Sequence, residues 1–258
     1  MKIGTSVYLE KIRENIDFYF ENYDCLEIQD FIMPNNLDDR RESIIDEYKK
    51  ILKEYSGQIS LHGPYVDLNP TSFDPLIKEI SIKRYLQIID IAKIVKAKYI
   101  VFHTTLDPRT QYDGYEEFFA KQMIEFWSTI VPLLEENQIV ALMENIHNES
   151  HRPIKKVIDT IKSPYLGACL DAGHVNAATD TDIGSWVLGY KEALRYIHLH
   201  DNDGIRDQHL PIGEGNLNVD EFFRTLKEIK YDGWIIAELL CGIEGQKRNL
   251  KEIKKRIK

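Results

Sequence analysis

Residues 195–203, RYIHLHDND, join an apolar run typical of a buried strand to imidazole and carboxylate side chains at its end. Five other segments repeat the arrangement: ISLHGPY (59–65), YIVFHTT (99–105), VALMENIH (140–147), ACLDAGHV (168–175) and WIIAELL (234–240). Histidine and carboxylate side chains are common protein ligands of divalent metals. Their recurrence at strand ends predicts parallel strands that bring ligands to one common opening, as in a metalloenzyme.

Strand-like and helix-like segments alternate along the whole chain. The expected strands are 3–8, 25–29, 59–64, 99–104, 139–144, 166–170, 196–200 and 234–238. Between them, runs such as residues 72–97 place apolar side chains on one helical stripe. Asn218 is the expected N-cap of a helix over 218–230, and Pro132 should kink or interrupt the helix expected over 115–137.

This alternation, without a low-complexity linker, predicts a single (β/α)₈ TIM-barrel domain over residues 1–258. An open, doubly wound sheet is the alternative architecture. The first strand argues against it, because KIGTSVY (2–8) has one glycine and no GxGxxG pattern follows it.

Composition restricts the functional classes. The net charge of −9 disfavours non-specific nucleic-acid binding, although a local cationic groove is compatible with it. Cys25, Cys169 and Cys241 show no CxxC spacing, so we expect reduced thiols rather than a disulfide framework. Because charged residues appear early and no run approaches the roughly 18 apolar residues that span a bilayer, we expect a soluble cytoplasmic protein without membrane contact. The oligomeric state stays open.

Strand parity groups the candidate ligands. Side chains two residues apart point the same way, so His198 and His200 share a face, as do Val101 and His103. A single histidine in a strand is usually a hydrogen-bonded structural residue, and His147, Glu149 and His151 fit an ordinary polar loop. The recurrence of carboxylates at strand ends is harder to explain without a cation, because buried unpaired charges are costly. The sequence therefore predicts a divalent-metal site.

The ordered motifs LHGPY, MEN, CLDAGH, HLHDND, HLPIGEGN and AEL resemble the xylose-isomerase-like barrel superfamily. This superfamily contains sugar (phosphate) isomerases and epimerases as well as endonuclease IV, an apurinic-site nuclease. In the isomerase branch, the resemblance implies one ion of manganese, zinc or magnesium. Its matching ligand positions are Glu144, Asp171, His198 and Glu238. The choice between His198 and His200 stays open, with His198 preferred because it begins the His-x-x-Asp pattern HLHD.

In endonuclease IV the resemblance implies a three-zinc cluster. The further ligand positions are His62, His103, His174, Asp207 and His209. The loops GTSVYLE (4–10), MENIHNE (143–149) and CLDAGHVNAA (169–178) depart from the nuclease pattern. In addition, Arg109 is the only cation of LDPRTQYDGY (106–115), which is a poor start for a track along a phosphate backbone.

The expected activity is proton transfer next to the carbonyl of a small sugar or sugar phosphate. Glu144 and Glu238 would act as base and acid. The expected substrate-binding residues are Glu27, His62, His174, His200 and Arg206, and Gly213–Gly215 could bind a phosphate. Two alternatives stay open: a zinc-dependent phosphodiesterase, and a barrel that binds a carbohydrate without turnover.

Overall fold

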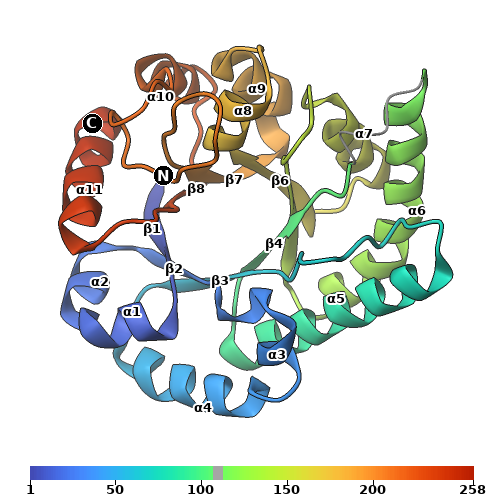
Figure 1. The fold of residues 1–258 in the computed structure, drawn as a ribbon, viewed down its shortest axis with the longest axis horizontal. Helices are drawn as coiled ribbons and strands as arrows, with labels where there is room; N and C mark the ends of the chain where they lie inside the picture. The colour runs from blue at the N-terminus through green and yellow to red at the C-terminus, as the bar shows by residue number, and fades with distance from the viewer. Residues whose placement is uncertain (107–112) are drawn as a thin grey trace.

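Eight parallel strands close into a barrel in which every strand pairs with its neighbours in sequence, and β1 pairs with β8 (Figure 1). The computed structural model describes residues 1–106 and 113–258, and Arg109 lies outside them. The strands are β1 Lys2–Val7, β2 Cys25–Ile28, β3 Gln58–His62, β4 Tyr99–His103, β5 Val140–Glu144, β6 Leu166–Asp171, β7 Leu194–Leu199 and β8 Trp234–Ala237. The predicted (β/α)₈ barrel is confirmed.

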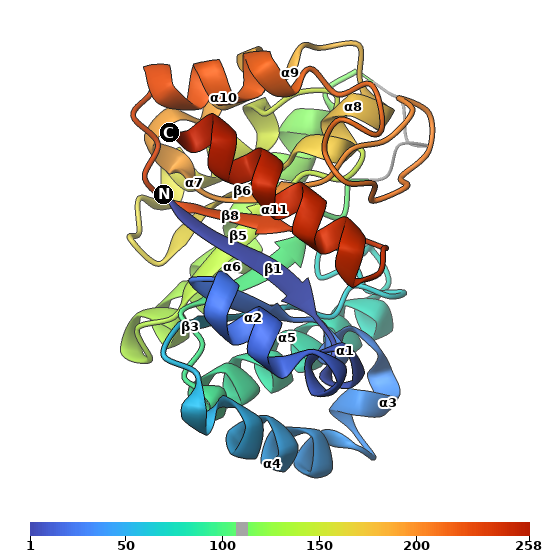
Figure 2. The same cartoon turned by 90° about the vertical axis from the view of Figure 1, so that its left-hand side faces the viewer.

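Helices cover the outside of the barrel, and Figure 2 shows α11 crossing beside β1 and β8. The helices are α1 Leu9–Glu14, α2 Ile16–Asn22, α3 Pro34–Leu37, α4 Arg41–Ile51, α5 Pro75–Val95, α6 Tyr115–Glu136, α7 Arg152–Ile161, α8 Ala172–Ala178, α9 Ile183–Tyr190, α10 Val219–Glu228 and α11 Ile243–Ile257. Short 3₁₀ helices are η1 Asp30–Ile32, η2 Leu52–Glu54 and η3 Lys191–Ala193.

Local sequence explains where several helices begin. Asn218 caps α10 by accepting a hydrogen bond from the Glu221 backbone N–H, as predicted. Asp74 caps α5 in the same way, with Pro75 at the first helical position. Pro132 lies within α6, which continues to Glu136, so the proline does not interrupt the helix, and Val131 and Leu134 on either side of it are buried in the core. A kink at Pro132 stays a prediction.

The barrel interior has an apolar layer directly beneath the strand ends. This layer includes Val101, Leu142, Cys169, Tyr196 and Ile236, which are all buried and belong to one packed cluster. Each of these residues stands two positions before a candidate ligand, so the two side chains share the interior face of their strand. These side chains fill the barrel interior. The candidate ligands form the next layer and therefore lie at the opening.

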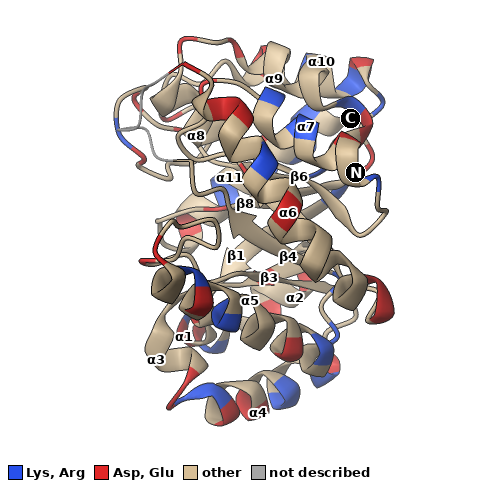
Figure 3. Cartoon of the chain, turned by 90° about the vertical axis from the view of Figure 1, so that its right-hand side faces the viewer, with Lys and Arg blue, Asp and Glu red and all other residues tan. Residues whose placement is uncertain are grey.

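Two findings concern the surface. No helix among residues 1–106 and 113–258 has the length and apolar content needed to cross a membrane. On the side drawn in Figure 3, acidic and basic residues are interspersed along the outer helices. That side therefore presents charge of both signs rather than a continuous basic track.

Candidate metal centre and substrate cavity

Four side chains from the ends of β5 to β8 form an inner group: Glu144, Asp171, His198 and Glu238. One potential ligand atom from each lies within 4.8 Å of all the others. His198 Nδ1 lies 3.0 Å from Glu144 Oε1 and 3.3 Å from Glu238 Oε2. These four residues, which the resemblance implies as ligands of a single ion, thus converge on one point at the barrel opening.

Other histidines border the inner group. His62 forms a second candidate set with Glu144 and His198. His62 Nε2 lies 3.6 Å from Glu144 Oε2, and His103 Nε2 lies 3.4 Å from the same oxygen. The ring of Tyr65 stacks on His103 with 3.9 Å between the ring centroids. Glu144 Oε2 therefore lies close to two imidazoles.

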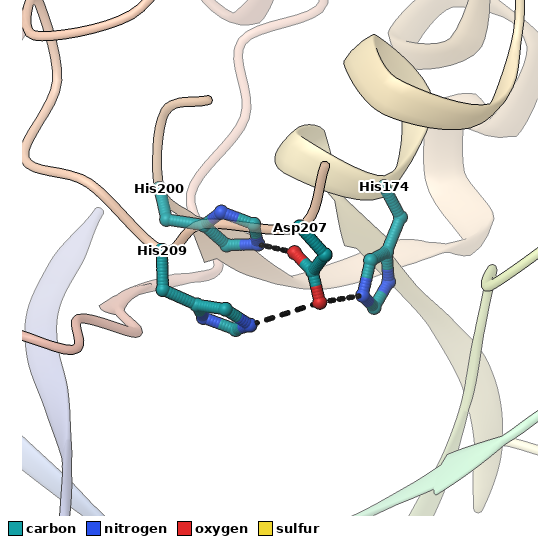
Figure 4. Close-up of side chains that lie close together, drawn as sticks. All are labelled: His174, His200, Asp207 and His209. Carbon is teal, nitrogen blue, oxygen red and sulfur yellow. Dashed lines mark hydrogen bonds and ion pairs between the residues drawn. The ribbon is translucent and has the colours of Figure 1, made fainter. Parts of the chain in front are cut away.

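An outer group consists of His174, His200, Asp207 and His209 (Figure 4). The Asp207 carboxylate lies between the three imidazoles. Its Oδ2 is 3.3 Å from His174 Nε2 and 3.1 Å from His209 Nε2, and its Oδ1 is 3.6 Å from His200 Nε2. The structure thus brings together all nine residues that match the two ligand sets, and it adds a tenth, His200, to the outer group.

Hydrogen bonds to backbone carbonyls determine which ring nitrogen of three histidines faces the opening. The Nδ1 atoms of His62, His174 and His209 each lie 2.9 Å from a backbone carbonyl oxygen, those of Gly63, Asn145 and Glu238 respectively. A carbonyl only accepts hydrogen bonds, so each Nδ1 carries a proton and Nε2 is the nitrogen that faces the opening, where it could bind a metal ion after losing its own proton. Metal-binding histidines are typically oriented in this way.

In both groups, carboxylates lie next to imidazoles, and each kind of side chain affects the pKa of the other. Burial opposes ionisation of Glu144, but the charge of His198 and its hydrogen bond to this carboxyl outweigh burial and hold the pKa of Glu144 well below its usual range. The same balance, with His174 and His200 as partners, lowers the pKa of Asp171 to about 2. Burial disfavours a charged His174, yet the charge of Asp171 and the hydrogen bond to Asp207 raise its pKa to about 10. Without a cation, protons on the imidazoles balance the carboxylates.

A divalent cation fits this donor set. Glu144 Oε2 is buried and has no hydrogen-bond partner among the described residues. Burial and the positive charge of neighbouring histidines lower the pKa of His103 to about 3, so this imidazole is neutral and available as a ligand. A buried carboxylate oxygen without a donor is costly unless a cation satisfies it. Carboxylate and imidazole donors suit manganese, zinc and, for the oxygen-rich inner group, magnesium.

A cavity of about 170 Å³ lies over both groups. Its lining includes two carboxylates of the centre, Glu144 and Glu238, and the imidazoles of His62 and His174. A neighbouring cavity of about 400 Å³ shares Tyr65 and His103 with it and is also lined by His147. A small polar compound in the first cavity would therefore touch the candidate acid and base directly.

Three residues predicted to bind substrate do not reach this cavity. Glu27 and His200 are fully buried, and their carboxylate and ring are used by neighbouring side chains. Arg206 is exposed and pairs with Asp203 in its own loop. Neither Glu27 nor His200 lines the cavity, so neither can contact a compound bound there.

The remaining predictions concern loops. The Gly213 backbone N–H donates to Asp201, so it is engaged within the protein rather than free for a phosphate. His151 packs against the rings of Trp186 and Tyr190, away from the centre. These contacts agree with an ordinary structural role for His151.

Two supporting residues escaped sequence reasoning. Asn145 accepts a hydrogen bond from the Asp171 backbone N–H and donates to the Asp171 carbonyl, both at 3.0 Å, and so ties β5 to β6 at the site. Gln29 donates to Glu238 Oε1 from beyond the end of β2. Two sequence features could have indicated these residues. Asn145 belongs to the MEN motif, and Gln29 lies two residues after Glu27, so strand alternation predicts that both side chains point the same way.

Comparisons with known proteins agree with this architecture. "Uncharacterized protein MJ1311" of Methanocaldococcus jannaschii is 28% identical over 242 residues, which cover 89% of this chain and 77% of that protein. A "Probable endonuclease 4" of Mycoplasmopsis pulmonis is 27% identical over 209 residues, covering 72% of this chain and 71% of that protein. A crystal structure of a "D-tagatose 3-epimerase-like protein" is 26% identical with a TM-score of 0.80, covering 100% of this chain and 97% of that one.

These similar proteins include both of the enzyme classes that the sequence motifs resemble, which supports an enzymatic role for this chain. The model of one protein family matches residues 21–257, nearly the whole barrel. The chain belongs to the xylose isomerase-like TIM barrel family.

Proposed function

We propose that this protein is a divalent-metal-dependent isomerase or epimerase that moves a proton next to the carbonyl of a small sugar or sugar phosphate. The observation that carries the proposal is the position of Glu144 and Glu238. Both carboxylates line the 170 Å³ cavity, and both belong to the inner group with Asp171 and His198. This volume is below the roughly 300–1,000 Å³ typical of sites for drug-sized ligands, which favours a small substrate.

The inner group, Glu144, Asp171, His198 and Glu238, would hold the ion, with manganese or zinc preferred and magnesium compatible. A bound ion would polarise the substrate carbonyl and stabilise the negative charge that develops on its oxygen. The support for this assignment is the donor chemistry together with Glu144 Oε2, a buried oxygen that has no hydrogen-bond partner within residues 1–106 and 113–258.

The two glutamates would divide the proton transfer. Glu144 is ionised because its pKa is held low, so it can take the proton from the carbon beside the carbonyl. Glu238, whose other oxygen is held by Gln29, would carry a proton at the start of the turnover and give it to the substrate, and the proton taken by Glu144 would afterwards exchange with solvent. Return to the same carbon from the opposite face gives an epimer, and return to the adjacent carbon gives an isomer. The imidazole of His62 lines the cavity and would bind substrate hydroxyls, with His174 as a second candidate.

Solvent exchange tests the proposal directly. The metal-replete protein is incubated in deuterated water with ketoses and with their phosphates, and the products are analysed by NMR. We expect deuterium at a carbon beside the carbonyl, and we expect this incorporation to cease after chelation of the metal. Exchange that persists after complete removal of the metal would contradict the proposed role of the ion.

The outer group favours a second candidate, a zinc-dependent phosphodiesterase acting on apurinic sites. His174 and His209 present their Nε2 atoms to Asp207, and the three residues could hold a further ion. Incubation with an abasic DNA duplex, with metal counted by elemental analysis, separates the candidates. Strand incision with three ions per chain and no deuterium incorporation would replace the isomerase by the nuclease.

A further inference from the structure

Glu27 lies on β2 beneath the inner group, where no substrate can reach it. Its side chain is fully buried and does not line the cavity. Carboxylate oxygen Oε2 lies 2.9 Å from His198 Nε2 and 2.7 Å from the hydroxyl of Tyr196. The sequence suggested a contact with a substrate hydroxyl, but the partners of Glu27 are protein groups of the barrel interior.

This contact determines which nitrogen of His198 carries a proton when a cation is bound. An ionised carboxylate only accepts hydrogen bonds, so Nε2 must be the donor toward Glu27. The other nitrogen, Nδ1, faces Glu144 at 3.0 Å and Glu238 at 3.3 Å. Nδ1 is therefore the atom that can offer a lone pair to an ion held by these carboxylates.

Glu27 is itself held in place from several sides. Parallel pairing sets it level with Ser6 of β1 and Ser60 of β3. The Tyr196 hydroxyl donates to Glu27 and lies 2.6 Å from Ser60 Oγ, so it links the carboxylate to β3. Gln29 Nε2 lies 3.4 Å from Glu27 Oε1 and also donates to Glu238.

The neighbouring histidine lacks such support. His200 is also fully buried, but its Nδ1 has no hydrogen-bond partner among the described residues. Its Nε2 lies 3.1 Å from Asp171 Oδ1, where it can donate to that carboxylate. Strand parity leaves His198 and His200 equivalent, but their hydrogen-bond partners distinguish them.

We propose that Glu27 is a positioning residue that orients His198 and keeps its Nε2 protonated, so that Nδ1 is the nitrogen that binds the ion. The inference rests on the proposed function only in requiring a cation in the inner group.

The test compares metal binding by the wild type and by Glu27→Gln, with a matched control, Glu21→Gln, at an exposed position of α2. Zinc affinity is measured by competition with a chromophoric chelator, which requires no turnover. Loss of an outer-shell partner typically weakens metal binding about 10–100-fold, and we expect Glu27→Gln to fall in this range. We expect Glu21→Gln to bind zinc as the wild type does.

Histidine ¹⁵N NMR of the zinc-loaded protein distinguishes positioning from a general loss of structure. In the wild type we expect His198 to show a protonated Nε2 and a metal-bound Nδ1. Glu27→Asp keeps the charge and should retain this signature with an intermediate affinity. If Glu27→Gln fails to fold, the wild-type spectrum and Glu27→Asp still decide the question.

Two results would overturn the inference while leaving the proposed function intact. One is wild-type zinc affinity in folded Glu27→Gln, and the other is a wild-type spectrum with Nε2 as the metal-bound atom. A wild-type protein that takes up no divalent metal at all would instead overturn the proposed function, and this inference with it.

Discussion

Glu238 combines two contacts that suit a catalytic carboxylate. One oxygen accepts a hydrogen bond from Gln29, and the other lies 3.3 Å from His198 Nδ1. Substitution Glu238→Gln keeps the size of the side chain but removes its charge and its ability to give and take a proton. We expect turnover to fall by about 10²-fold or more, the usual loss for a positioned acid or base, with the fold unchanged by circular dichroism.

Metal content must be measured in the same variant, because Glu238 also belongs to the inner group. Glu244→Gln serves as the control, since Glu244 is an exposed residue in the first turn of α11. Near-wild-type turnover of Glu238→Gln at normal metal content would remove Glu238 from the proton transfer.

Gly173 shows how closely the residues of the site are packed. A Cβ atom at this position would lie only 1.9 Å from Cε1 of the buried His200 ring. Gly173→Ala must therefore displace His200 and disturb its contact with Asp171. We expect a loss of about 1–3 kcal/mol in the free energy of unfolding, typical of an overpacked interior, measured by urea denaturation.

Gly242→Ala is the matched control for this substitution. Apart from its chain neighbours, none of the described residues would lie within 4 Å of a Cβ atom at Gly242, and the φ of −73° at this position is one that any residue adopts. Because Gly242 is the N-cap of α11, where alanine is less favourable than glycine, we expect a small loss of stability that stays below the loss in Gly173→Ala. Equal stability of the two alanine variants would show that His200 has room to move.

At the level of secondary structure, the helix caps are local features that the sequence specifies. Asn218 Oδ1 accepts from the Glu221 backbone N–H at 3.2 Å, and Asn218 Nδ2 donates to Glu221 Oε2 at 2.9 Å. Asn218→Ala removes both bonds and should lower the free energy of unfolding by about 1 kcal/mol. Asn218→Ser, which retains an acceptor oxygen, should recover most of it. A loss in Asn218→Ser as large as in the alanine variant would refute the capping role.

For the whole molecule, the imidazoles of the outer group couple stability to pH when metal is absent. Interactions with Asp207 and neighbouring carboxylates overcome burial and raise the pKa of His174 to about 10 and that of His209 to about 9. Their ordinary pKa is about 6.5. A raised pKa stabilises the folded state fully below the unfolded value, and the contribution is lost as pH rises through the folded value.

The melting temperature of the metal-free protein should therefore decline between about pH 6.5 and pH 10. Thermal unfolding with excess chelator measures this decline. A double variant, His174→Gln and His209→Gln, should show a flatter profile over the same range. An unchanged slope in the double variant would assign the pH dependence to other groups.

The sequence by itself determined the barrel and the kinds of side chain at its opening. Strand and helix periodicities are local, so eight alternations predicted the topology, which the structure confirms. The parity of a strand also assigned His103, Glu144 and Asp171 to the same interior face as the apolar residues two positions before them.

Only the tertiary structure decided how deep each polar side chain lies in the barrel and which ring nitrogen of each histidine faces the opening. Parity places Glu27 and His198 on interior faces, but the register between strands sets Glu27 level with Ser60, below the opening, and His198 level with Asp171. Whether a ring turns Nδ1 or Nε2 toward the cavity depends on partners distant in sequence, such as the Asn145 carbonyl for His174. Local sequence does not encode these contacts, because they arise only when separate strands pack around one interior.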